Sequence, residues 1–156
     1  MREERNKGYR ASEPPERVLI MVKANIVREE DGIPMLYKEF KRGFGIRIVH
    51  PQNPKAPSKN LSVQLLYIAP GGSVDPHSHE NEEVYILLEG TGKGHFGLGK
   101  PIDIEPGMFF HLPANAEHGL ENTGKTMMKV MVTTSPPFPV WPEWEIVAPK
   151  KEKRKK

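Results

Sequence analysis

The chain has 156 residues, of which 37% are hydrophobic and 28% charged, a composition typical of a folded domain with a core of its own. It contains no cysteine, which excludes disulfide bonds, a thiol nucleophile and cysteine ligands to a metal. The net charge of +3 does not indicate a nucleic-acid-binding protein, because residues 150–156 carry six basic residues and one acidic residue and leave the rest of the chain net negative.

In chain order, residues 1–17 mix charges with glycine and a Pro-Pro pair and offer few apolar side chains to bury, so we expect a flexible N-terminal arm. A strand-like pattern follows over residues 18–27. Residues 44–50 and 61–69 read as strands, the second ending at a Pro-Gly-Gly sequence. Between them, residues 51–58 contain three prolines and predict a surface loop.

Residues 83–89 form the most informative predicted strand. If Glu83 faces the interior, period-two alternation turns Tyr85 and Leu87 inward as well. The opposite face is then wholly apolar, with Val84, Ile86 and Leu88. A strand that is apolar on both faces needs cover on both, from N-terminal strands, from the C-terminal segment or from a second subunit.

Five more short strands are predicted between glycine or proline turns, at residues 92–96, 102–104, 108–112, 118–121 and 126–134. Turns at such close spacing favour an all-β sandwich or barrel, and no apolar pattern recurs at helical spacing over three turns. The Pro- and Trp-rich residues 135–144 predict an extended surface segment. No signal-peptide pattern opens the chain and no apolar run approaches membrane-spanning length, so we expect a cytoplasmic protein that binds neither membrane nor nucleic acid.

The candidate chemistry lies in two stretches. His77 and His79 are two residues apart, so their imidazoles project to one side of an extended strand, and Glu83 follows a short turn. His118 stands just beyond a Pro-Ala-Asn turn. Imidazole and carboxylate suit a divalent transition metal such as Fe, Mn, Ni, Co, Cu or Zn.

Both stretches resemble the two sequence motifs of the cupin superfamily. The first motif is matched by Gly71, His77, His79, Glu83 and Gly90, and the second by Gly107, Pro113, His118 and Asn122. Sixteen residues separate them. The usual glycine after the proline is Asn115 here, and asparagine is the next residue most tolerant of left-handed backbone geometry. The resemblance covers about residues 60–135.

The resemblance implies a double-stranded β-helix, or jelly-roll, and metal ligation by His77, His79, Glu83 and His118. We therefore expect a single cupin barrel domain over residues 18–148, with peripheral strands and the Pro/Trp-rich segment, followed by a basic disordered tail at 149–156. Cupins are commonly dimers, and the apolar outer face of residues 83–89 supports a homodimer here.

A divalent ion with three imidazoles and one carboxylate keeps positions for substrate and a charge of about +1, which favours small ligands with oxygen donors. We expect a metal-dependent enzyme of dioxygenase, decarboxylase or isomerase type. Two alternatives stay open: a sensor or storage cupin whose metal only holds its ligand, and a cupin without metal. Tyr85 and His111 are the candidate catalytic residues, His111 as a proton donor if its strand turns it inward.

Overall fold

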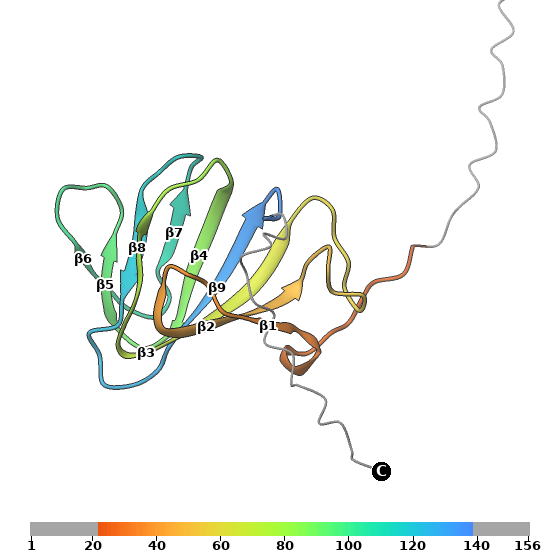
Figure 1. The fold of residues 1–156 in the computed structure, drawn as a ribbon, viewed down its shortest axis with the longest axis horizontal. Helices are drawn as coiled ribbons and strands as arrows, with labels where there is room; N and C mark the ends of the chain where they lie inside the picture. Colours follow the sequence, from red (N-terminus) through yellow and green to blue (C-terminus); the bar gives the residue numbers. More distant parts are fainter. Residues whose placement is uncertain (1–21, 139–156) are drawn as a thin grey trace, which may run out of the picture.

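A computed structural model describes residues 22–138 and confirms the all-β, jelly-roll fold (Figure 1). Within this range a 3-10 turn, η1 (Glu29–Asp31), precedes the strands β1 (Ile33–Met35), β2 (Phe40–Val49), β3 (Ser62–His77), β4 (Glu82–Glu89), β5 (Gly92–His95), β6 (Ile102–Ile104), β7 (Phe109–Leu112), β8 (His118–Glu121) and β9 (Met128–Ser135). No helix of residues 22–138 has the length and apolar character needed to cross a membrane. The predicted arm at 1–17 and the basic tail at 149–156 lie outside the described residues.

The strands form one curled antiparallel sheet in the order β6-β5-β8-β3-β9-β4-β7, and β2 joins β3 and β1 beside this path. The long strand β3 organises it, because its first half pairs with β9 and its last residues pair with β8 (Figure 1). The strand predicted to end at Pro70 instead bends there and continues to His77. Gly71, at φ +72°, allows the bend, and its backbone N–H donates to the carbonyl of Asn122, 2.9 Å away.

The predicted strand at 18–27 is wrong over its described part, since residues 22–27 form neither strand nor helix. The sheet begins at β1, which pairs with β2 on one side only within the described chain. Pro34 fits this edge position, because a proline has no N–H to donate to a second neighbour.

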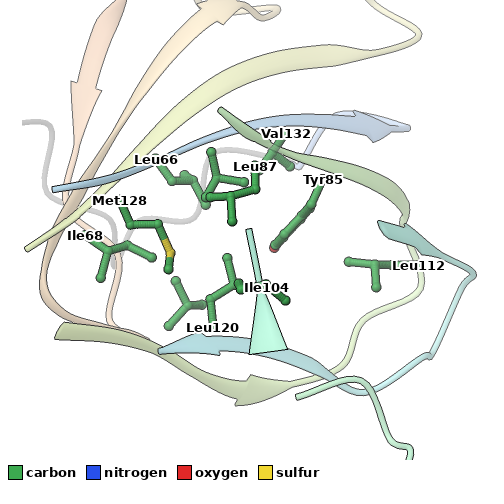
Figure 2. Close-up of a cluster of buried hydrophobic side chains, with 11 residues drawn as sticks. Leu66, Ile68, Tyr85, Leu87, Ile104, Leu112, Leu120, Met128 and Val132 are labelled. Carbon is green, nitrogen blue, oxygen red and sulfur yellow. The ribbon is translucent and has the colours of Figure 1, made fainter. Parts of the chain in front are cut away.

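The core lies on the inner face of the curled sheet, where β3, β4 and β9 bury every second residue. The predicted alternation of β4 is confirmed: Glu83, Tyr85 and Leu87 are buried. Figure 2 shows the apolar side chains of opposite walls pointing toward one another. The cluster comprises Leu66, Ile68, Val74, Tyr85, Leu87, Ile104, Leu112, Leu120, Met128, Val130 and Val132.

The outer face carries an apolar row across five neighbouring strands. Consecutive members are Cα partners in the strand pairs β2–β3, β3–β9, β9–β4 and β4–β7. This outer row consists of Ile46, Leu65, Met131, Ile86 and Phe109. Phe109 is 69% exposed, so the row ends in a large aromatic side chain open to solvent.

Candidate metal centre

Strand pairing brings the three motif histidines together. His77 is the last residue of β3 and His118 the first of β8, and the two are Cα partners. His79 follows in the loop to β4, where the backbone N–H of Asn115 donates to the carbonyl of His79 over 2.7 Å. One ring nitrogen of each histidine lies within 4.8 Å of the others. Asn115 has φ +66°, so it adopts the left-handed geometry expected where the motif usually has glycine. Its hydrogen bond to His79 joins the second motif to the first.

Each imidazole is oriented by a backbone carbonyl two residues away. The Nδ1 atoms of His77, His79 and His118 lie 2.8, 3.0 and 2.9 Å from the carbonyl oxygens of Asp75, Asn81 and Ala116. A carbonyl only accepts, so each Nδ1 carries the proton and donates. In the neutral ring each Nε2 is then a lone-pair acceptor, which is the tautomer that a metal requires.

Glu83 lies against these rings from β4. Its Oε2 atom is 3.3 Å from Nε2 of His79 and 3.2 Å from Nε2 of His118, and its Oε1 atom accepts a hydrogen bond from Oγ1 of Thr134 at 2.6 Å. Glu83 is 2% and His118 1% exposed. Nε2 of both histidines and Oε2 of Glu83 are buried without a hydrogen-bond partner among the described residues. Buried acceptors that face one another are stable when a cation lies between them, so the residues fit a metal ion.

The protonation states agree with a cation site. Burial raises the pKa of Glu83, but His118, His79 and Thr134 together outweigh burial and bring it to about 2, so the carboxylate is ionised at neutral pH. Burial lowers the pKa of His77, and the neighbouring His118 and His79 lower it further, against the hydrogen bond to Asp75. His77 is therefore neutral, and its Nε2 lone pair is free to coordinate.

Tyr85 follows Glu83 on the inner face of β4. Its ring meets that of His118 edge to face, with centroids 5.6 Å apart. The side chain is 4% exposed, and burial, with the nearby Glu83 carboxylate, raises the pKa of its hydroxyl well above the usual value. Tyr85 thus keeps its proton at neutral pH.

His111 does not reach the interior. In β7 it alternates with Phe110 and Leu112, so it shares the outer face with Phe109. Its side chain is 60% exposed, and Nε2 lies 2.7 Å from Oε1 of Glu82. The expectation that His111 approaches the metal is corrected by this geometry, because the register of β7 against β4 turns the ring to solvent.

A pocket of about 520 Å³ opens beside the centre. Its lining includes His77, His79 and Glu83 of the centre, the side chains Leu66, Tyr85 and Phe138, and the polar side chains Tyr37 and Gln64. The ring of Phe138 stands edge-on to His79 at 4.7 Å. The pocket therefore combines polar groups of the centre with apolar side chains, as in most small-molecule sites.

Sequence reasoning missed Thr134, Tyr37 and Gln64. Alternation with Val130 and Val132 on β9 could have placed Thr134 inward. Its contact with Glu83 depends on the pairing of β9 with β4, which lies 51 residues away in sequence. Nothing local in the sequence marks such a pairing.

The cupin-domain family profile matches residues 64–134, a range that contains all four motif side chains of the centre. The chain therefore contains a cupin domain over these residues. A crystal structure of a predicted oxalate decarboxylase from Thermotoga maritima has a fold similar to this cupin, with a TM-score of 0.61 at 23% identity, over 71% of this chain and 98% of that one.

Two relatives of this cupin are named for different functions, one as a binding protein and one as a lyase. Auxin-binding protein 1 from Arabidopsis thaliana is 35% identical over 88 residues, 51% of this chain and 44% of the relative. Dimethylsulfoniopropionate lyase DddW from Ruegeria pomeroyi is 32% identical over 65 residues, 42% of each protein. This cupin spans about half or less of the length of each relative, so the relatives' activities are not transferred with the fold.

Proposed function

We propose that this cupin binds a divalent transition metal through His77, His79, His118 and Glu83 and uses it to bind and transform a small oxygen-rich organic ligand. The observation that carries the proposal is the set of buried atoms, two Nε2 atoms and one Oε2 atom, that face one another at 3.2–3.3 Å without a hydrogen-bond partner among the described residues. Three imidazoles with Nδ1 fixed by a carbonyl, beside one buried carboxylate, have no role in an apolar scaffold. A divalent ion held there would polarise the oxygens of a bound ligand, and iron would add dioxygen chemistry.

The chain's own residues supply binding and orientation. Tyr85 keeps its proton and can donate a hydrogen bond to an oxygen of the ligand beside the histidines. Leu66 and Phe138 present apolar surface that an apolar part of the ligand would contact. Charge built up on a ligand oxygen would be stabilised by the Tyr85 hydroxyl without a change in its protonation state.

A binding protein without catalysis is the second candidate. The similarity to an auxin-binding protein favours it. The raised pKa of Tyr85 also favours it, because a phenol that holds its proton is a poor general base.

Two measurements test the proposal. Elemental analysis of protein purified without chelator or affinity tag should find about one transition-metal ion per chain. The His118→Ala variant should lose the ion, because His118 is a buried ligand of the proposed centre. His111→Ala is the matched control, an exposed histidine that should leave the metal content unchanged. Full metal content in a His77, His79 and His118 triple alanine variant would refute the centre.

The second measurement separates the two functions. Oxygen uptake or product formation by metal-loaded protein with small enols, diketones and organic acids supports the enzyme, and the loss of turnover but not of binding in Tyr85→Phe would assign that residue to catalysis. Tight binding without turnover of any bound compound supports the binding protein.

We also propose that the outer row of Ile46, Leu65, Met131, Ile86 and Phe109 joins two copies of this chain. The charged side chains beside the row are paired within the chain, Lys129 with Glu29 at 3.1 Å and His111 with Glu82 at 2.7 Å. A second copy of the same face would therefore meet apolar surface without a concentration of like charge. Light scattering should find a dimer that Phe109→Glu converts to a monomer, whereas a wild-type monomer at micromolar concentration would refute the interface.

A further inference from the structure

Gln64 is a polar residue of the pocket lining outside the metal centre. It belongs to β3, is 7% exposed and lines the same pocket as His77 and His79. The hydroxyl of Tyr37 donates to Oε1 of Gln64 over 2.5 Å. That bond orients the amide and leaves its Nε2 group to donate to a partner in the pocket. A ligand atom can take that place.

Strand register places this amide opposite Tyr85. Gln64 and Tyr85 are both Cα partners of Val132, so the three form one row across β3, β9 and β4. Val132 is fully buried, and the two polar side chains flank it in this row. Two strand spacings separate the Cα atoms of Gln64 and Tyr85 by about 10 Å. A small organic molecule that reaches the metal centre beside Tyr85 can therefore also reach the amide.

When the metal ion of the proposed function neutralises Glu83, which also lines the pocket, the buried charge of Arg47 beside Gln64 favours an anionic acceptor. Arg47 is the Cα partner of Gln64 on β2, is 2% exposed, and donates to Oε1 of Gln52 at 2.5 Å. Burial raises the pKa of the Tyr37 hydroxyl, and the positive charge of Arg47 opposes that rise. The charge of Arg47 therefore acts on a residue that lines the pocket. Glu39 and Glu80 also line the pocket, where both are partly or fully open to solvent that screens their charge.

We propose that Gln64, oriented by Tyr37, is a specificity-determining residue that binds a carboxylate at the far end of a ligand whose near end lies at the metal centre. The ligand class is a small organic acid with two separated oxygen-bearing groups and an apolar body between them, which would contact the apolar lining that includes Leu66 and Phe138. This inference rests on the metal-bound ligand of the proposed function. It adds that the carboxylate at one end of the ligand is bound by protein side chains and not by the metal.

The experiment uses cobalt(II)-loaded full-length protein and follows its visible absorption during titration with dicarboxylates from malonate to adipate. Each is compared with the monocarboxylate of the same carbon number, such as succinate with butyrate. The wild type should bind at least one dicarboxylate more tightly than its partner, and Gln64→Met should reduce that preference roughly 10- to 100-fold, because a hydrogen bond to a charged group is lost. Asn60→Leu, which removes an amide from an exposed residue that does not line the pocket, should keep the preference.

Metal content and unfolding temperature of each variant establish that the fold and the centre are retained. Tyr37→Phe is the second variant, since it keeps the ring, releases the amide and should weaken the same preference. A dicarboxylate preference that survives in both variants, or a wild type that responds equally to both kinds of acid, overturns the role of Gln64 alone. A wild type whose spectrum responds to no acid overturns the metal-bound ligand of the proposed function and this inference with it.

Discussion

Replacing Thr134 with valine tests the hydrogen bond that holds Glu83 at the metal centre. The change removes one hydroxyl and keeps the branched shape of the side chain, so little packing is lost. Thr134 is fully buried and Glu83 2% exposed, so water cannot replace the 2.6 Å bond to Oε1. Leaving a charged buried acceptor without its donor costs about 2 kcal/mol.

The loss is measurable in the metal-free protein. For a chain of this size about 2 kcal/mol lowers the melting temperature by roughly 4–8 °C. Glu83 also loses its fixed orientation, so we expect metal affinity, measured by competition with a chromogenic chelator, to fall by about 10- to 100-fold. Both effects have the same cause and should appear together.

Thr133→Val is the matched control. Thr133 is the preceding residue of β9, faces outward, and pairs with Val84 and Val63. The same chemical change there should leave both the melting temperature and the metal affinity within error of the wild type. If the two valine variants behave alike, the hydroxyl of Thr134 does not support Glu83 and the reasoning is refuted.

Two further predictions concern residues outside the metal ligands. Burial and the charge of Arg47 lower the pKa of His50 to about 4, although the hydrogen bond to the Phe138 carbonyl opposes the shift. The stability that neutral His50 contributes is therefore complete above pH 6.5 and is lost as the pH falls toward 4. Urea unfolding at pH 7.5 and pH 5 should show a loss of up to about 2 kcal/mol that His50→Asn reduces; an equal loss in the variant would contradict this. Asn115 has φ +66°, so Asn115→Ala should cost about 1 kcal/mol and Asn115→Gly nothing, as judged by urea midpoints; equal midpoints for Ala and Gly would show that the left-handed turn is not strained.

Local chain geometry explains what could be read from the sequence. The placement of His77 and His79 near one another follows from their spacing at a strand end, and the inward direction of Tyr85 follows from alternation with Glu83. The left-handed turn at Asn115 is also a local property, since it depends on the residue's own backbone preference. Each of these was predicted because neighbours within a few residues decide it.

His50 shows the limit of such local reasoning. A histidine beside a proline-rich loop reads as exposed, yet His50 is 2% exposed. Its Nδ1 accepts from the backbone N–H of Gln52, and its Nε2 lies 3.3 Å from the carbonyl of Phe138, 88 residues away. Polar contacts keep His50 buried, and neither hydrophobic periodicity nor composition predicts such contacts.

The sequence by itself determined the family, the residue types of the centre and the inward-facing side of β4. Motif spacing and alternation are properties of a single segment of the chain, so they can be recognised without knowing how the strands pair. Only the tertiary structure decided that His118 pairs with His77 across β3 and β8, and that Thr134 supports Glu83. It also decided that Gln64 shares a row with Tyr85 and that His111 faces solvent. These contacts depend on which strands lie side by side and in which register, and a shift of one residue in register exchanges the two faces of a strand.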